Sequence, residues 1–305
     1  MVVGRFAPSP TGRMHLGNVF CALLSWLSAR SQGGEWRLRI EDLDPQRSRR
    51  DYALQLQEDL QWLGLPWDGE VVWQSERSDI YEHYLQLLKD AGLTYPCFCT
   101  RADIMATQAP HETDGRIVYA GTCREKYKSS SPLREVGRGL LPAAVRLMVP
   151  NEEICFLDGH YGKQQVNLAQ HCGDYILRRK DGAWAYQLAV VVDDASMRIT
   201  EVVRGRDLLL STPQQLHLFQ TLGFEAPSYI HHPLLINEDG QRLCKRDKSL
   251  DLGYLREKHV TPEEIIGRLA YLAGIIPEPT PTLPKDLLPF FTWQKVPKED
   301  ITAFL

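Results

Sequence analysis

The order of elements in the first 63 residues restricts the chain to few folds. Residues 2–6 form a short apolar strand, a loop rich in proline and glycine follows at 7–18, and apolar residues then recur at helical spacing at 19–27. Residues 36–40 are a second strand, and residues 51–63 a second helix. Strands joined by a crossover helix pair in parallel, so we predict an α/β fold with a Rossmann-type doubly wound parallel sheet.

The α/β rhythm is interrupted and then resumes. A cysteine cluster, a polar loop and a serine-rich turn occupy residues 95–150, which indicates an insertion. Strands are predicted at 175–177, 189–192 and 199–203, and helices at 74–91 and 213–222. Thr261 is expected to cap a last helix, followed by Pro262 and two glutamates. The predicted parts are a first half of the sheet domain at 1–94, an insertion at 95–170, a second half at 171–235 and a short helical region at 236–305.

The composition favours a cytoplasmic globular protein. The 305 residues, 43% of them hydrophobic and 24% charged, suit one large domain or two smaller ones. The chain has no apolar run of membrane-spanning length and no signal-peptide pattern, so we expect no membrane association. Seven cysteines, an odd number, favour free thiols in a reducing compartment, with some of them on a metal.

The loop at residues 5–18 has the properties of a phosphate site. It leads from a strand into a helix, and the free N–H groups and dipole at a helix start favour an anion. Gly17 would let a nucleotide approach the backbone, and His15 would donate a hydrogen bond to a phosphate oxygen. Taken alone, this pattern is more typical of a turn that carries a surface histidine.

A second cationic motif, Lys245-Arg246-Asp247-Lys248-Ser249, follows a turn at 238–242. Two lysines three residues apart, on a loop, can neutralise a triphosphate and the departing pyrophosphate. A solvated basic loop is the simpler interpretation of this motif when it is considered alone.

The two motifs together resemble the HIGH and KMSKS signatures of class I aminoacyl-tRNA synthetases. His15-Leu16-Gly17-Asn18 differs from the first signature at its last residue, and the second motif differs at Arg246 and Asp247. The resemblance implies an ATP site with Mg²⁺ arriving on the nucleotide. The implied ATP-binding residues are His15, Gly17, Asn18, Lys245, Lys248 and Ser249, of which His15, Lys245 and Lys248 would be catalytic.

The residues around the first motif narrow the resemblance to the glutamyl-tRNA synthetases. Residues 5–12, RFAPSPTG, resemble the opening of that family, and residues 186–194, 199–207 and 211–213 are similar to it as well. The resemblance therefore covers residues 1 to about 250. The implied glutamate-binding residues are Arg5, Ala7, Ser9, Glu41, Tyr186 and Arg204.

These residue types suit the chemistry of glutamate, which has two carboxylates and one ammonium. Arg5 and Arg204 can each pair with a carboxylate, and the Tyr186 hydroxyl can donate a hydrogen bond. Glu41 follows a predicted strand and can receive the ammonium group, with Ser9 assisting. Ala7 would contribute its backbone.

Cys97, Cys99 and Cys123 form a possible zinc site that lacks one ligand for a tetrahedron. By general frequency His111 is the better fourth ligand. A Cys-x-Cys…Tyr-x-x-x-Cys pattern resembles the site of one branch of glutamyl-type enzymes, which implies Tyr119 instead. We therefore expect one structural Zn²⁺, held by Cys97, Cys99, Cys123 and Tyr119.

Only residues 250–305 follow the second motif, too few for the anticodon-binding domains of a glutamyl-tRNA synthetase. This short tail, together with the Cys/Tyr set, resembles the glutamyl-Q tRNA(Asp) synthetase family. Members activate glutamate and transfer it to the queuosine base at the wobble position of tRNA(Asp). The resemblance implies a ligase whose partner is the anticodon stem-loop of tRNA(Asp), acting as a monomer, with Arg178, Arg179 and Lys180 as candidate phosphate contacts.

Two other functions fit part of the pattern. A minimal glutamyl-tRNA synthetase would charge the 3′ end of tRNA(Glu). An inactive paralogue would bind RNA or an amino acid as a regulator, although the intact His15, Lys248, Glu41 and Arg204 argue against it.

Overall fold

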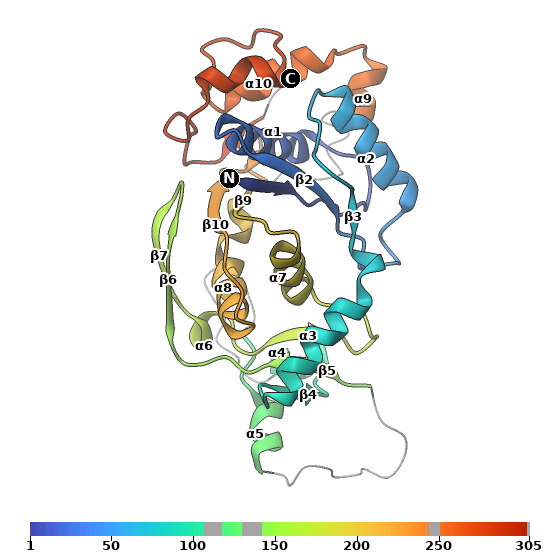
Figure 1. The fold of residues 1–305 in the computed structure, drawn as a ribbon, viewed down its shortest axis with the longest axis vertical. Coiled ribbons are helices and arrows are strands. Elements are labelled where there is room, and N and C mark those ends of the chain that lie inside the picture. The colour runs from blue at the N-terminus through green and yellow to red at the C-terminus, as the bar shows by residue number, and fades with distance from the viewer. Residues whose placement is uncertain (107–117, 130–141, 242, 244–250, 304–305) are drawn as a thin grey trace.

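Two sets of parallel strands form the centre of this computed structural model, which describes residues 1–106, 118–129, 142–241, 243 and 251–303 (Figure 1). The first set contains β1 (Val3–Phe6), β2 (Glu35–Ile40) and β3 (Val72–Trp73), paired in that order. The second contains β9 (Glu201–Gly205), β10 (Ser228–His232) and β6 (Glu153–Asp158). An antiparallel edge strand, β7 (Gly162–Asn167), completes the second set.

The two sets lie edge to edge at β1 and β9. The backbone N–H of Thr200 donates to the carbonyl of Val3 at 2.9 Å, and the N–H of Val3 donates to Thr200 Oγ1 at 2.9 Å. The combined order is β3-β2-β1-β9-β10-β6-β7, so the direction of winding reverses between β1 and β9. This confirms the predicted doubly wound parallel sheet, in which ligands bind beyond the carboxyl ends of the strands at such a reversal.

Helices cover both faces of the sheet (Figure 1). Val203 and Ile230 belong to the apolar core around α1 (Leu16–Ser31), whereas their neighbours Val202 and Tyr229 belong to a different cluster. Alternate residues of the strands are therefore buried on opposite faces, as expected for parallel strands with both sides covered. The core around α1 also includes side chains of α2 (Arg50–Trp62), α9 (Leu252–Glu257) and α10 (Pro262–Leu272).

A second core joins α3 (Ser78–Asp90), α7 (Tyr186–Ser196) and α8 (Thr212–Thr221). Residues 189–192 lie inside α7, so the strand predicted there is wrong. These residues are apolar and buried on all sides, and such a run does not by itself distinguish a buried strand from a buried helix. The other two predicted strands in this part are observed near their expected positions, as β8 (Tyr175–Arg178) and β9.

The lower end of the molecule in Figure 1 is a small antiparallel sheet of β4 (Thr94–Cys97), β5 (Ala144–Leu147) and β8. The short helices α4 (Arg101–Ala106), α5 (Thr122–Ser129) and α6 (Leu168–His171) lie near it. Strand β6 comes from the same stretch of sequence but pairs with β10. The domain boundaries at 95, 171 and 236 stay a prediction.

The C-terminal region packs on the core around α1. Thr261 caps α10 as predicted, because Thr261 Oγ1 accepts from the Glu264 N–H at 3.2 Å while Glu264 Oε2 accepts from the Thr261 N–H at 2.7 Å. The strand β12 (Ile301–Thr302) pairs in parallel with β11 (Leu235–Ile236). The described residues also form the 3₁₀ helices η1 (Gln74–Glu76), η2 (Arg206–Ser211) and η4 (Pro284–Phe290). None of the described helices has the length and apolar character needed to cross a membrane.

Candidate active site

A cavity of about 500 Å³ opens at the carboxyl ends of β1, β2 and β9, where the winding reverses. Every described residue of the two predicted substrate sites lines this cavity, namely Arg5, Ala7, Ser9, His15, Gly17, Asn18, Glu41, Tyr186 and Arg204. Lys245, Lys248 and Ser249 lie outside the described residues. The structure thus brings together side chains from both ends of the sheet domain.

The first motif forms the cap of α1. His15 Nδ1 accepts from the Gly17 N–H at 3.1 Å, and Asn18 Oδ1 accepts from the His15 N–H at 3.1 Å. Because Nδ1 is the acceptor, a neutral His15 ring carries its proton on Nε2. A Cβ at position 17 would lie 2.9 Å from His15 Cε1, so Gly17 is required for this cap as well as for any close approach of a nucleotide.

The described residues on either side of the second motif lie beside the first motif. Leu243 is buried and lines the cavity, and Asp251 forms a β-bridge with His15. The Leu252 N–H also donates to the Met14 carbonyl at 3.0 Å. The segment that carries Lys245 and Lys248 therefore begins and ends beside the helix cap that carries the first motif.

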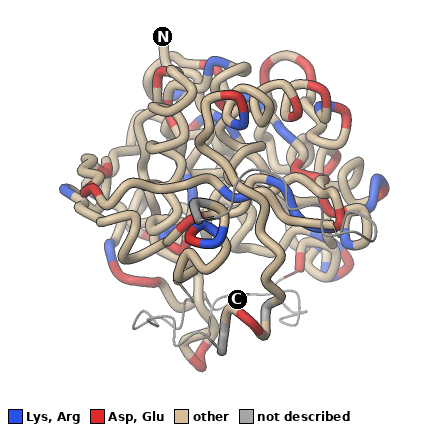
Figure 2. Tube along the Cα trace, turned by 90° about the horizontal axis from the view of Figure 1, so that it is seen from below, with Lys and Arg blue, Asp and Glu red and all other residues tan. Residues whose placement is uncertain are grey.

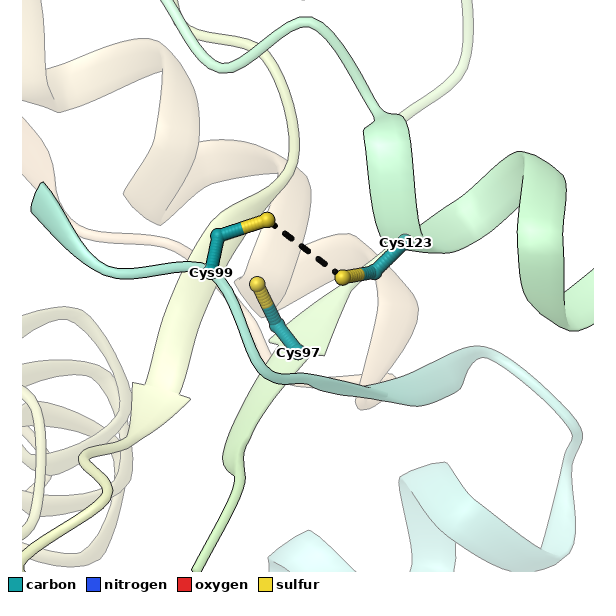
Figure 3. Close-up of side chains that lie close together, drawn as sticks. All are labelled: Cys97, Cys99 and Cys123. Atoms are coloured by element: carbon teal, nitrogen blue, oxygen red, sulfur yellow. Dashed lines mark hydrogen bonds between the residues drawn. The ribbon is translucent and has the colours of Figure 1, made fainter. Parts of the chain in front are cut away.

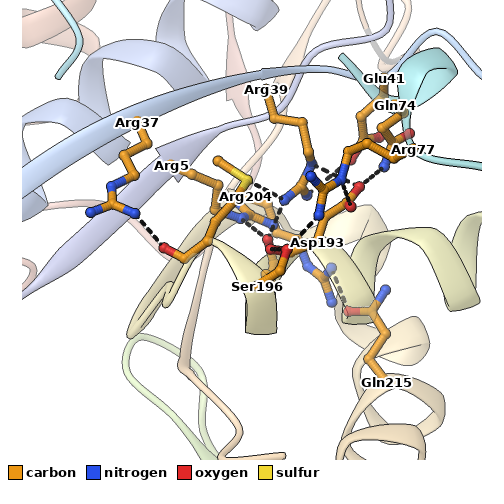
Figure 4. Close-up of polar contacts among 12 residues, drawn as sticks. Arg5, Arg37, Arg39, Glu41, Gln74, Arg77, Asp193, Ser196, Arg204 and Gln215 are labelled. Carbon is orange, nitrogen blue, oxygen red and sulfur yellow. Dashed lines mark hydrogen bonds and ion pairs between the residues drawn. The ribbon is translucent and has the colours of Figure 1, made fainter. Parts of the chain in front are cut away.

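Behind Arg5 and Glu41 lies a buried network of charges (Figure 4). Arg39, fully buried, donates to Asp194 Oδ1 at 2.6 Å and to Glu41 Oε1 at 3.2 Å. Arg5 Nε donates to the same Asp194 oxygen at 3.3 Å. Burial would raise the pKa of Asp194, but the charges of Arg39 and Arg5 outweigh it and lower that pKa below the usual range. Arg39 and Asp194 therefore fix Arg5 and Glu41 before any ligand is present.

The negative charge of Glu41 is less strongly compensated by its neighbours than that of Asp194. Burial raises the pKa of the Glu41 carboxyl, although Arg39 and Arg5 act in the opposite direction. A cationic partner in the cavity would stabilise the ionised form further.

A second buried carboxylate, Asp193, anchors the outer part of this network. It accepts from Arg77 Nε at 2.6 Å, from Gln74 Nε2 at 2.7 Å and from the Tyr81 hydroxyl at 2.8 Å. These donors come from η1, from α3 and from Arg77 between them, so Asp193 holds the segment after β3 against α7.

Arg204 is 4% exposed and is surrounded by neutral acceptors. Nε donates to His231 Nε2 at 3.0 Å, Nη1 to Gln215 Oε1 at 2.8 Å and Nη2 to Thr212 Oγ1 at 2.8 Å. The hydrogen bonds to the Tyr186 hydroxyl and the Leu208 carbonyl are longer, at 3.4 Å each. No ion pair to Arg204 is found within the described part of the chain, so its buried charge lacks a direct anionic partner there.

The three predicted metal-ligating cysteines point toward one another (Figure 3). Their sulfur atoms all lie within 4.8 Å of one another, and Cys99 Sγ is 3.4 Å from Cys123 Sγ. Sulfur ligands on a tetrahedral ion with metal–sulfur bonds of about 2.3 Å lie about 3.8 Å apart. Cys97, Cys99 and Cys123 could therefore hold a metal ion.

The Tyr119 hydroxyl lies in the same cluster, 3.5 Å from Cys97 Sγ and 3.7 Å from Cys99 Sγ. The Cys123 backbone N–H donates to it at 2.8 Å. A bridge to Gly173 fixes Tyr119, and since Gly173 has a φ of +62° and a Cβ there would lie 2.5 Å from the Tyr119 carbonyl, only glycine fits. His111, the alternative ligand, lies outside the described residues.

The thiols of this cluster differ in acidity. Burial raises the pKa of Cys99 to about 11. Burial also raises that of Cys123, but hydrogen bonds from the Phe98 backbone and the Tyr119 hydroxyl outweigh it and give a pKa of about 7. The cluster thus contains one thiol that readily becomes a thiolate, the form in which cysteine binds metals.

The candidate RNA contacts have partners within the chain. Arg178 pairs with Glu82 at 2.6 Å, Arg179 pairs with Asp181 at 2.6 Å, and the Lys180 ammonium donates to the Phe98 carbonyl. Seen from the end that carries the small sheet, basic and acidic positions are interspersed (Figure 2). Neither observation singles out these three residues as a phosphate-binding surface.

The family model of the class I tRNA synthetases (E and Q), catalytic domain, matches residues 1–283. This chain belongs to that family. Glutamyl-Q tRNA(Asp) synthetases are full-length relatives: the protein from Nitratidesulfovibrio vulgaris is 45% identical, covering 99% of this chain and 96% of its own length. The protein from Neisseria gonorrhoeae is 43% identical, covering 99% of this chain and 100% of its own.

Solved structures of class I synthetases agree with this assignment. The chain resembles a glutamate tRNA ligase from Elizabethkingia meningosepticum, solved with its amino acid, with a TM-score of 0.80 and 29% identity. The match covers 99% of this chain and 66% of that one. A glutamate-tRNA synthetase from Elizabethkingia anophelis gives a TM-score of 0.81 at 29% identity, over 99% of this chain and 68% of that one. This synthetase chain therefore spans about two thirds of those ligases.

Sequence reasoning missed the residues that hold the synthetase cavity in shape. Arg39 is a charged residue within β2, at a position that is fully buried. A charge inside a strand of a covered parallel sheet is unusual, and this is one signal that could have revealed Arg39. Asp193 and Asp194 end an apolar run, and Asp158 and His231 lie on strands that the sequence does not bring together. Their partners are far apart in the chain, so only the tertiary structure reveals them.

Proposed function

We propose that this chain activates L-glutamate with ATP and transfers the glutamyl group to the queuosine base at the wobble position of tRNA(Asp). The observation that carries the proposal is similarity along the whole chain to proteins named glutamyl-Q tRNA(Asp) synthetase. The buried arginines Arg5 and Arg204, together with Glu41 and Tyr186 in the cavity wall, support a dicarboxylic amino acid as the substrate.

The first step is attack of the glutamate α-carboxylate on the α-phosphorus of ATP. A bond forms between the carboxylate oxygen and phosphorus, the bond to the bridging oxygen breaks, and pyrophosphate leaves. The step needs positioning and charge stabilisation rather than a protein nucleophile. His15 Nε2–H would donate to a phosphate oxygen, Lys245 and Lys248 would neutralise the pyrophosphate, and Mg²⁺ would arrive with ATP, where Gly17, Asn18 and Ser249 contact the nucleotide.

Recognition of glutamate follows from the charges in the wall. The buried Arg204 has only neutral partners among the described residues, so a substrate carboxylate would supply the missing negative charge. Its two longest hydrogen bonds, to Tyr186 and Leu208, are the weakest and are the ones that a carboxylate would replace. Burial raises the pKa of Tyr186, so its hydroxyl stays protonated and can donate.

Glu41, beside Arg5 and Ser9, is the carboxylate suited to the substrate ammonium. Arg5 remains for the second carboxylate, and Ala7 offers its backbone. Arg5 and Arg204 then complement the two carboxylates of glutamate, and Glu41 complements its ammonium group.

We also propose that the cysteine cluster holds one structural Zn²⁺ with Tyr119 as the fourth ligand. Three sulfur atoms and the Tyr119 hydroxyl lie together at distances that suit a tetrahedral site. The Arg146 guanidinium lies 3.8 Å from the centre of the Tyr119 ring and packs against it. Burial raises the pKa of the Tyr119 hydroxyl, so binding of the metal would have to displace its proton.

One assay tests the function. Purified protein is given ATP and radiolabelled glutamate with four acceptors: queuosine-containing tRNA(Asp), the same tRNA with its 3′-terminal adenosine removed, tRNA(Asp) lacking queuosine, and tRNA(Glu). We expect pyrophosphate exchange without any tRNA and label on the first two acceptors only.

Label on tRNA(Glu), with exchange that requires tRNA, would instead show a minimal glutamyl-tRNA synthetase that charges the 3′ end. No adenylate formation under any condition would exclude both functions and favour an inactive paralogue.

A further inference from the structure

We propose that Asp158 and His231 are positioning residues for glutamate recognition, holding Arg204 through a neutral imidazole. His231 Nδ1 lies 2.6 Å from Asp158 Oδ2, and its Nε2 lies 3.0 Å from Arg204 Nε. The side chains of His231 and Asp158 have no exposed surface, and Arg204 is 4% exposed. This inference rests on the proposed function, because it concerns how the same cavity binds glutamate.

The tautomer of His231 follows from its neighbours. A guanidinium can only donate, so Nε2 must accept and the ring proton sits on Nδ1, where it donates to the Asp158 carboxylate. Burial lowers the pKa of His231, the Asp158 hydrogen bond opposes this, and the Arg204 charge lowers it further, so the ring remains neutral. Asp158 thus selects the only tautomer that can hold Arg204.

The same geometry explains why a carboxylate does not hold Arg204 directly. An acidic side chain in place of His231 would neutralise the guanidinium and compete with the substrate carboxylate. The imidazole fixes the direction of Nε while leaving the positive charge uncompensated. The Tyr229 ring, 5.0 Å from the guanidinium carbon and stacked on His231, packs against the same pair.

Asp158 does not line the cavity and acts on it through His231 and Arg204. It ends β6, and its Oδ1 accepts from the backbone N–H groups of His160 at 3.0 Å and Tyr161 at 2.8 Å. Oδ1 therefore shapes the β6–β7 turn and also accepts from the His231 backbone N–H at 3.4 Å, whereas Oδ2 orients the His231 ring. The two tasks can be separated by mutation.

Asp158→Asn separates them. The amide oxygen can still accept from His160 and Tyr161, while its NH₂ group faces His231 Nδ1 and forces the ring proton onto Nε2, against the N–H of Arg204. We expect the KM for glutamate to rise about tenfold or more, since one charged hydrogen bond is replaced by a repulsive contact. The KM for ATP should stay within about twofold, because the change acts on Arg204 alone.

Steady-state pyrophosphate exchange, with glutamate and ATP varied separately, measures both constants. Asp174→Asn is the matched control, because Asp174 is also buried but serves the small antiparallel sheet through Tyr95 and Arg124. It should leave the ratio of the two KM values unchanged. His231→Gln, which can still accept from Arg204 Nε, should be closer to wild type than His231→Phe, which cannot.

Equal changes in both KM values in Asp158→Asn, or equal effects of His231→Gln and His231→Phe, would overturn the inference while leaving the proposed function intact. A wild-type protein that exchanges no pyrophosphate with glutamate would instead contradict the proposed function. Thermal unfolding of each variant separates a lost fold from a lost contact.

Discussion

The cavity and the cysteine cluster both gather polar side chains, but different forces hold them in place. In the cavity, Arg39 is fixed between Asp194 and Glu41, so the protein itself balances most of the charges. In the cluster, Cys97, Cys99 and Cys123 meet through sulfur contacts of a kind that a metal ion would replace with bonds. The cavity is organised by the chain alone, whereas the proposed Zn²⁺ would supply much of the stability of the cluster.

This difference predicts that the two regions respond separately to mutation. Damage to the cluster should affect metal content and the stability of the small sheet, with little effect on glutamate activation. Damage to the cavity should do the reverse. A variant that changes metal content and glutamate activation equally would show that the cluster and the cavity are not independent.

The largest effect is expected from loss of the metal. Cys97→Ser, or treatment with a strong chelator, should remove the proposed zinc and with it a large part of the roughly 10 kcal/mol of binding free energy that structural zinc contributes to small domains. Elemental analysis measures the metal, and hydrogen exchange of the β4, β5 and β8 amides measures the local stability. Glutamate-dependent pyrophosphate exchange should change less than about threefold, because the cavity has its own charge network.

Cys155→Ser is the control, since Cys155 is exposed on β6 and should affect neither quantity. Unchanged zinc content in Cys97→Ser would exclude the proposed cluster.

A smaller but more specific effect is expected from Arg204→Lys. Lysine keeps the charge but cannot make the forked hydrogen bonds to Gln215 and Thr212, and its ammonium is more strongly hydrated. We expect kcat/KM for glutamate to fall by about 10²–10³, equivalent to about 3–4 kcal/mol. Zinc content should remain that of the wild type.

Arg37→Lys provides the matched change outside the cavity. Arg37 lies on β2 and bonds to Glu35 and the Met197 carbonyl, and substitution there should leave glutamate activation unchanged. A similar loss in both variants would mean that Arg204 acts through the fold rather than on the substrate.

The local parts of this molecule could be predicted from the sequence, and the long-range parts could not. The strand-loop-helix-strand order at the N-terminus and the Thr261 cap depend on neighbouring residues, and both are confirmed. The apolar run at 189–192 was assigned to a strand because burial on all sides removes the periodicity that marks a helix.

The candidate site shows the same division. Family resemblance predicts the glutamate-binding residues, and the structure brings them to one cavity, among them Arg5, Glu41, Tyr186 and Arg204. The residues that orient them, such as Asp194 and Asp158, are 189 and 73 residues away in sequence from Arg5 and His231, the groups that they hold. No local pattern encodes such pairs, so charge alone did not reveal them.

The smallest effect is expected at the ion pair of Arg206 and Asp300, which ties the C-terminal segment to the chain beyond β9. The Arg206 side chain is 45% exposed, so solvent screens this pair far more than the buried Arg39 network. Asp300→Asn keeps an oxygen for the Leu234 N–H and should cost only about 0.5–1 kcal/mol of the free energy of unfolding at pH 7.

The pH dependence of the stability lost in Asp300→Asn distinguishes the ion pair from simple packing. The hydrogen bonds from Arg206 lower the pKa of Asp300. Its stabilising effect is therefore complete above the unfolded-state pKa of about 3.9 and is lost as the pH falls through the lower, folded-state value. Urea unfolding of wild type and Asp300→Asn should therefore differ at pH 7 and at pH 5, and the difference should shrink below pH 4. Asp286→Asn, at an exposed position in η4, should show no such difference at any pH. A constant difference at all pH values would mean that Asp300 stabilises the C-terminal segment through the Leu234 hydrogen bond and packing rather than through its charge.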